Sequence, residues 1–207
     1  MRMFRYILST PKNVMHPLEP NKFFPNMRID MVEFPEAIGG DKIVETTFEG
    51  PLHVQLRLAL LHVHNCVIQE RVIKVPGKAE ARRFFNYPYA AVEEALATAV
   101  YHKAYDEREP PIEVRVLSDR IEIVSHPGAD LSVSIDGLQR YEELSSNFRN
   151  RRIGEFLKEL HLIQGGNTGF TKIINALAHN GSPLPLFETD EERLSFAVTI
   201  YKHPECR

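Results

Sequence analysis

Two polar side chains with chemical potential, Glu94 and Thr98, lie four residues apart in a segment with helical periodicity. Residues at this spacing share one flank of a helix, so a carboxylate and a hydroxyl would lie together beside the apolar stripe. A carboxylate is a candidate general base, and a hydroxyl oxygen can complete the shell of a Mg²⁺ ion. The alternative is an ordinary polar helix flank.

A glycine-rich segment, residues 165–169, leads into a second apolar-periodic stretch. Glycines let backbone amides approach phosphate oxygens, and a helix N-terminus adds positive partial charge. The pattern therefore predicts phosphate contact at Gly165, Gly166, Thr168 and Gly169. A plain glycine-rich connection between two helices is the alternative.

The basic residues Arg149, Arg151 and Arg152 form a local basic face at the start of another predicted helix. Such a face can contact phosphate or the DNA backbone, or it can simply be a solvated helix start. No metal site is predicted from the nearby pattern of His62 and Cys66, because the histidine between them would point to another face of the helix.

Two functions are not predicted from the motifs, namely a hydrolase that uses a serine or cysteine nucleophile and a motor. The Tyr101-His102 pair suggests acid–base chemistry, but no serine or cysteine nucleophile lies in a recognisable elbow. No Gly-x-x-x-x-Gly-Lys-Ser/Thr phosphate loop occurs in the 207 residues, and the chain lacks the length for paired motor domains.

The composition limits the partners and the compartment. The net charge of −3 argues against a grip on DNA by the whole domain. Two widely spaced cysteines are no disulfide framework, and no apolar run reaches the roughly 20 residues of a membrane span. We therefore expect a cytoplasmic protein that is not embedded in a membrane.

Periodicity predicts a two-layer α/β sandwich, with a mixed, mostly antiparallel sheet and amphipathic helices on one face. Residues 1–27 are predicted to be a proline-rich arm or linker, and 28–207 a single domain. Strands are expected at Arg28–Phe34, Lys42–Phe48, Ile112–Leu117, Arg120–Val124 and Leu194–Ile200. Helices are expected from Pro51 to Val67, from Pro88 to Val100, around Ile153–Leu160 and around Phe170–Leu177.

Several stretches carry a family resemblance: Tyr87-Pro88, the run from Glu94 to Tyr105, Asp119–Val124 with Pro127-Gly128, Arg149-Asn150, Gly165 with Thr168-Gly169, and Gly181-Ser182-Pro183. In this order and spacing they resemble the RecG-like C-terminal module of Schlafen/AlbA-type transcriptional regulators. That module is a divergent relative of the GHKL (Bergerat-fold) ATPases. The resemblance implies a GHKL-like domain, with lead-in elements in 28–86 and an ATPase-like core in 87–207.

The resemblance also implies roles for individual residues, with ATP and Mg²⁺ as cofactors. Glu94 matches the glutamate that activates the attacking water, and Thr98 stands where the family has a Mg²⁺-binding asparagine. His126 stands where GHKL proteins have the adenine-binding aspartate, two residues before Gly128. His102 belongs to the same candidate nucleotide-binding set. A loop histidine beside a turn glycine is the alternative for His126.

The leading hypothesis is a nucleotide-binding-derived regulatory or assembly domain without ATP turnover. DNA would be bound through a domain outside this chain, and a homo-oligomer is compatible with the role. The alternatives are a working Mg²⁺-dependent ATPase and a scaffold that binds no nucleotide. The nucleotide hypothesis requires the helices from Pro88 and from Thr168 to lie on the same sheet face, with Glu94 next to Gly169.

Overall fold

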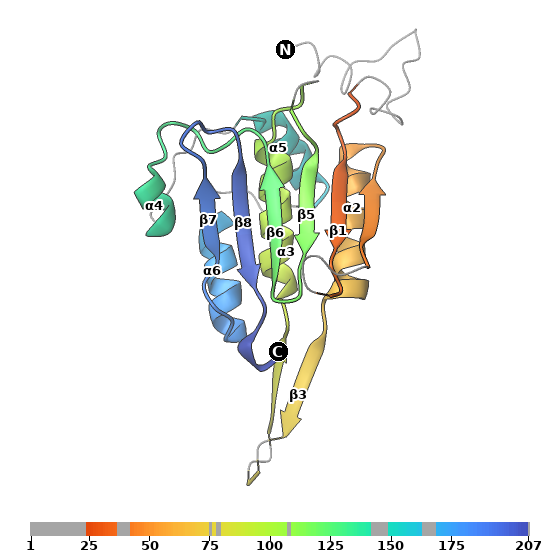
Figure 1. Cartoon of the computed structure of the whole chain (residues 1–207), viewed down its shortest axis with the longest axis vertical. Helices are drawn as coiled ribbons and strands as arrows, with labels where there is room; N and C mark the ends of the chain where they lie inside the picture. Colours follow the sequence, from red (N-terminus) through yellow and green to blue (C-terminus); the bar gives the residue numbers. More distant parts are fainter. Residues whose placement is uncertain are drawn as a thin grey trace.

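A six-stranded mixed sheet lies at the centre of the computed structural model (Figure 1), which describes residues 24–36, 42–74, 76–77, 80–106, 109–141, 149–162 and 169–206. The strand order is β2-β1-β5-β6-β8-β7. Only the β1–β5 pair is parallel. The strands are β1 (Ile29–Glu33), β2 (Val44–Phe48), β5 (Ile112–Val116), β6 (Arg120–Ser125), β7 (Leu186–Thr189) and β8 (Phe196–Tyr201).

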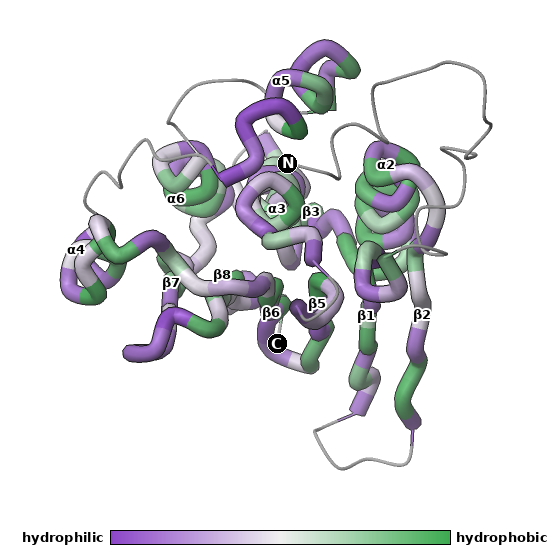
Figure 2. Tube along the Cα trace, turned by 90° about the horizontal axis from the view of Figure 1, so that it is seen from above, coloured by the Kyte–Doolittle hydropathy of each residue, from purple (hydrophilic) through white to green (hydrophobic). Residues whose placement is uncertain are grey.

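The longer helices cover one face of this sheet, as the view from above shows (Figure 2). They are α2 (Leu52–His62), which continues as the π-helical turn η2 (Val63–Val67), α3 (Tyr89–His102), α5 (Arg151–Glu159) and α6 (Gly169–Asn180). Helix α3 lies over the middle of the sheet and packs against α6 along its length. Two short helices are also present, α4 (Ile135–Gln139) and η3 (Pro204–Cys206).

Strand alternation explains which sheet face forms the core. On β6, Ile121 and Ile123 are fully buried, whereas Glu122 and Val124, which alternate with them, are only partly covered. The inward side chains meet the apolar stripe of α3, where Ala95 and Leu96 are fully buried. Prolines at both helix starts, Pro51 and Pro88, are the capping residues of α2 and α3. Their fixed φ and missing N–H suit the first turn of a helix.

The sequence prediction of the fold class is confirmed: the sheet is mixed and mostly antiparallel, and the helices lie on one face. One predicted strand starts too early, because Leu194 lies in the turn before β8. The carboxylate of Asp190 accepts hydrogen bonds from the backbone N–H groups of Leu194 and Ser195. These bonds hold both residues in the β7–β8 turn rather than in the strand ladder.

Five described elements were not predicted, namely the short helices α4 and η3, strand β7 and the two strands of a separate ribbon. The ribbon consists of β3 (Glu70–Lys74) paired antiparallel with β4 (Ala81–Phe85). It forms its own two-stranded sheet and projects from the body beyond the N-terminal end of α3 (Figure 1). In the part of the chain that the structure describes, no helix is long and apolar enough to cross a membrane.

Candidate functional site

The predicted juxtaposition of α3 and the start of α6 is present. A Cβ added to Gly169, the first residue of α6, would lie 3.1 Å from Oε1 of Glu94 and 3.4 Å from Oγ1 of Thr98. Glu94 and Thr98 therefore share the α3 flank that faces the N-terminus of α6. Because a helix N-terminus carries positive partial charge, the carboxylate of Glu94 lies where an anion is stabilised.

Lys172 contributes a charge to this site that the sequence analysis missed. Its Nζ lies 3.4 Å from Oε2 of Glu94, and the Glu94 side chain is 19% exposed. Burial raises the pKa of the neighbouring Glu93, the negative charge of Glu94 adds to this, and Lys172 and a hydrogen bond from Tyr89 oppose it. The 3.4 Å contact between Lys172 and Glu94 is an ion pair within the protein, beside the start of α6.

The C-terminal end of α3 is capped by the side chains of Arg149 and Asn150. Nδ2 of Asn150 donates to the carbonyl of Tyr101 at 3.0 Å and to that of Lys103. Arg149 donates to the carbonyl of His102 at 2.9 Å. Since the last carbonyls of a helix lack intrahelical partners, this motif has a structural role that accounts for its place in the chain.

His102 lies on the same α3 flank as Glu94 and Thr98, one further turn along. Burial, with the positive charge of Arg149 in second place, lowers the pKa of His102 to about 4. Burial also lowers the pKa of the adjacent Lys103 to about 8, although Glu109 and Asp106 oppose the shift. Lys103 donates from Nζ to the carbonyl of Pro110. Because its pKa is lowered to about 4, His102 is neutral at pH 7.

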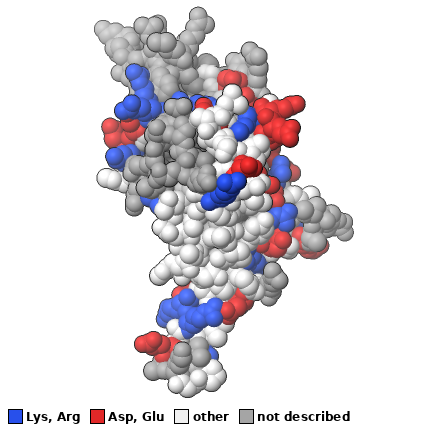
Figure 3. Space-filling model, turned by 90° about the vertical axis from the view of Figure 1, so that its left-hand side faces the viewer, with Lys and Arg blue, Asp and Glu red and all other residues white. Residues whose placement is uncertain are grey.

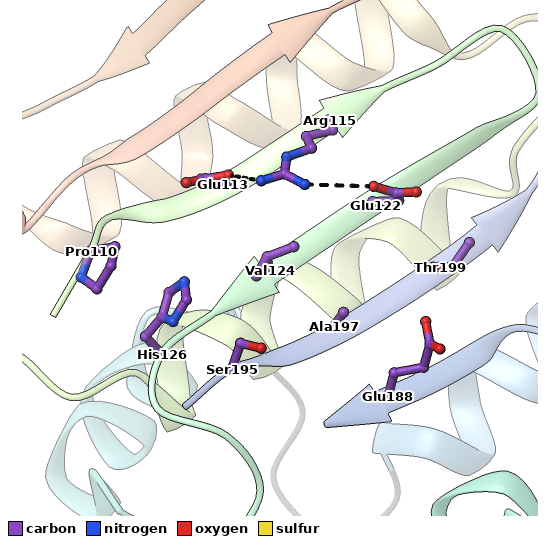
Figure 4. A pocket seen from close by; sticks show the side chains of 10 residues that line it. All are labelled: Pro110, Glu113, Arg115, Glu122, Val124, His126, Glu188, Ser195, Ala197 and Thr199. Atoms are coloured by element: carbon purple, nitrogen blue, oxygen red, sulfur yellow. Dashed lines mark hydrogen bonds and ion pairs between the residues drawn. The ribbon is translucent and has the colours of Figure 1, made fainter. Parts of the chain in front are cut away.

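His126 is not brought to Glu94. Along β6 the side chains alternate between the two sheet faces, and Glu122 and Val124 point to the face without helices. His126, two residues after Val124, points to this same open face (Figure 4). Its Nδ1 lies 2.8 Å from the carbonyl of Leu194, so this nitrogen is the donor. The role of His126 in adenine binding stays a prediction, and the geometry places its ring outside the Glu94 site.

The open face carries a pocket of about 470 Å³. Within it, Arg115 forms ion pairs with Glu113 at 2.5 Å and with Glu122 at 4.0 Å (Figure 4). The full lining consists of Pro110, Glu113, Arg115, Glu122, Val124, His126, Glu188, Ser195, Ala197 and Thr199. Charged groups that satisfy one another in this way are typical of a solvated sheet face, and we assign no ligand to it.

Gly128 is explained by close packing. A Cβ at this position would lie 2.4 Å from Oγ1 of Thr189 and 2.8 Å from backbone atoms of both Arg193 and Ser195. The backbone N–H of Gly128 also donates to the carbonyl of Arg193 at 2.8 Å. Glycine is needed here because the loop after β6 lies directly against the β7–β8 turn.

The remaining predicted residues divide into two groups. Gly165, Gly166 and Thr168 lie outside the described residues. Arg151 and Arg152 are exposed on the first turn of α5, where Arg151 pairs with Glu155 at 3.1 Å.

Metal coordination by three or more His, Cys, Asp or Glu side chains is not found within the described ranges. Nε2 of His62 instead lies 2.7 Å from the carboxylate of Glu33. At the Glu94 site, the oxygen groups are one carboxylate, already paired with the ammonium group of Lys172, and one hydroxyl. Mg²⁺ binds oxygen groups of this kind, but the carboxylate is already neutralised by Lys172, so the ion would gain little from them.

Comparison with known proteins finds one family model that matches part of the chain. Residues 109–200 match the family model described as "Putative ATP-dependent DNA helicase recG C-terminal". This confirms the resemblance to the RecG-like C-terminal module over β5 to β8, including α6. The matched range begins after α3, so the assignment of Glu94 and Thr98 depends on the geometry described above.

A solved structure shows the same fold over most of the chain. The crystal structure of the DIP2311 protein from Corynebacterium diphtheriae superposes with a TM-score of 0.66 at 19% sequence identity. The similarity covers 86% of this chain and 35% of that protein, so the chain spans about a third of its length. At this identity the likeness concerns the fold alone. No curated protein sequence matches the chain.

Proposed function

We propose that this chain is a nucleotide-binding-derived module of a DNA-associated transcriptional regulator and that it does not turn over ATP. One observation carries the proposal: the carboxylate of Glu94 is held between Lys172 and the first turn of α6. A general base must be free to accept a proton from the attacking water. In this arrangement Glu94 instead acts as an internal counter-ion.

The neighbouring residues support binding more than hydrolysis. The N-terminus of α6 and the ammonium group of Lys172 both favour a phosphate group. Thr98 offers one hydroxyl oxygen where the resembled family has an amide oxygen, so a Mg²⁺ ion brought in with the nucleotide would gain little from the protein. Misplacement of this kind costs on the order of a hundredfold in rate.

We expect phosphate release from ATP by the wild-type chain to equal the background without protein. Glu94→Gln should leave this rate unchanged, because the carboxylate does no chemistry. Titration calorimetry with a non-hydrolysable ATP analogue and Mg²⁺ should detect binding, and Lys172→Met should weaken it. Glu93→Gln is the matched control, since it removes a carboxylate one residue away that accepts a hydrogen bond from Tyr89 and on which Lys172 has the smallest of the effects that shift its pKa.

Two results would replace the proposal with one of its rivals. Hydrolysis at ordinary enzymatic rates that disappears in Glu94→Gln but persists in Glu93→Gln would establish an active ATPase. Absence of any calorimetric signal with the analogue would indicate a scaffold that binds no nucleotide. In an inactive wild type, Thr98→Asn tests whether restoring the amide oxygen is sufficient to start turnover.

A further inference from the structure

The β3–β4 ribbon is the least covered part of the described chain. Every residue of β3 is exposed, and on β4 only Phe84 is buried. Val72 and Ile73 remain 53% and 42% exposed, although both are apolar. Isolated two-stranded ribbons are marginal in water, so a ribbon that leaves apolar side chains exposed on both faces is suited to contact a partner.

The ribbon also concentrates positive charge. Residues 70–85 contain five basic and two acidic side chains, whereas the whole chain has 25 basic and 28 acidic residues. Lys and Arg side chains gather on the projecting ribbon below the body, with acidic groups beside them (Figure 3). The rest of the chain is therefore acidic and repels a polyanion, while the ribbon attracts one.

Basic side chains lie on both faces of the ribbon. The strand register pairs Ile73 with Arg82 on one face and Val72 with Arg83 on the other. The side chains of Arg71 and Lys74 make no hydrogen bond or ion pair with the residues that the structure describes. The two remaining arginines form exposed pairs, Arg82 with Glu205 and Arg83 with Glu70, and the guanidinium group of Arg82 also lies 5.2 Å from the ring centroid of Phe84. Exposed pairs contribute little, so these arginines can exchange their partners.

The root of the ribbon is fixed to the body. The side-chain amide of Asn180, at the end of α6, accepts from the backbone N–H of Phe85 and donates to its carbonyl, both at 2.8 Å. The ring of Phe84 stacks on that of His203, with centroids 4.2 Å apart. The ribbon is thus presented in one orientation and needs little ordering on binding.

From these observations we infer that the β3–β4 ribbon is a contact for duplex DNA. Two strands lie about 4.8 Å apart, and a two-stranded ribbon fits the major groove, which is about 12 Å wide. Arg71, Lys74, Arg82 and Arg83 reach the phosphates from both faces, and Val72 and Ile73 contact the sugars. Pairing of two ribbons from two copies is disfavoured because their basic residues would oppose each other. The inference does not depend on the nucleotide site.

The test is fluorescence anisotropy of a labelled 20-base-pair duplex with the full chain, without nucleotide, at several salt concentrations. With about four phosphate contacts, binding should weaken about 150-fold between 50 and 200 mM salt. The double variant Arg71→Gln/Lys74→Gln leaves about two contacts, so its affinity should fall only about 12-fold over the same range. It should also bind at least tenfold more weakly than wild type at 50 mM salt.

The control is Arg151→Gln/Arg152→Gln, which makes the same change of charge on the exposed turn of α5 and should keep the wild-type salt dependence. Absence of duplex binding by the wild type at 50 mM salt would overturn the inference, as would loss of binding in the α5 variant alone. Sedimentation velocity without DNA tests whether the ribbon instead binds a second copy of the chain. Self-association of the wild type that Arg71→Gln/Lys74→Gln abolishes would assign the ribbon to that contact and overturn the inference.

Discussion

Replacement of Gly128 by alanine is expected to lower the free energy of unfolding by about 1–3 kcal/mol, the usual cost of overpacking. The added methyl group would overlap Oγ1 of Thr189 at 2.4 Å and backbone atoms of Arg193 and Ser195 at 2.8 Å. Backbone atoms cannot rotate away as a side chain can, so the β7–β8 turn has to move. For a chain of this size the loss corresponds to a drop in Tm of about 2–4 °C per kcal/mol.

Gly169→Ala is the matched control for this prediction. The atom nearest to the added Cβ of residue 169 would be Oε1 of Glu94 at 3.1 Å, at the end of a flexible side chain. Alanine is also a better helix former than glycine. Thermal unfolding followed by circular dichroism should therefore separate the two variants. Equal melting temperatures for wild type and Gly128→Ala would show that the loop and the turn are not in close contact.

Acidification from pH 7 to pH 4 is expected to destabilise the protein through His102. Burial and the charge of Arg149 lower its pKa from 6.5 to about 4 in the folded state. Below pH 6.5 the unfolded chain therefore binds a proton that the folded chain does not. The contribution of His102 is fully present above pH 6.5 and is lost as the pH falls to about 4, with a magnitude of about 3 kcal/mol.

Urea unfolding at pH 7, 6, 5 and 4 checks this dependence, and His102→Gln should flatten it. Any constant cost of the substitution cancels, because the comparison is between slopes. Arg149→Gln should make the loss smaller and end it at a higher pH, because removing the second cause of the lowered pKa brings the folded-state pKa of His102 closer to 6.5. Asp190, whose pKa is lowered to about 2 mainly by the N–H of Leu194, titrates in a separate, more acidic range. Parallel slopes for wild type and His102→Gln would contradict the prediction.

The sequence was most informative where one physical pattern was strong. Alternation of apolar residues located β5 and β6, and prolines marked the starts of α2 and α3. The approach of Gly169 to Glu94 followed from two one-sided helices that had to cover the same sheet face. These features depend on local periodicity and on the need to bury apolar surface, and both are visible in a single sequence.

Other features could not be predicted because they lack such a pattern. Both faces of the β3–β4 ribbon are exposed, so its sequence shows no period of two. The contact between Lys172 and Glu94 joins residues 78 positions apart. The outward direction of His126 was available in principle, because Ile121 and Ile123 fix the parity of β6. Arg149 and Asn150 gave only a basic or polar signal, although their bonds cap α3.

Helix α6 connects two distant points of the molecule, the Glu94 site at its N-terminal end and the root of the ribbon at its C-terminal end. By donating to and accepting from Phe85, Asn180 takes the place of a neighbouring strand at the root of the ribbon. The other end of α6, about 18 Å away for twelve residues, touches Glu94. We therefore expect a ligand that displaces α6 at one end to tilt the ribbon at the other. By thermodynamic reciprocity, any partner that tilts the ribbon changes the affinity of that ligand by the same factor.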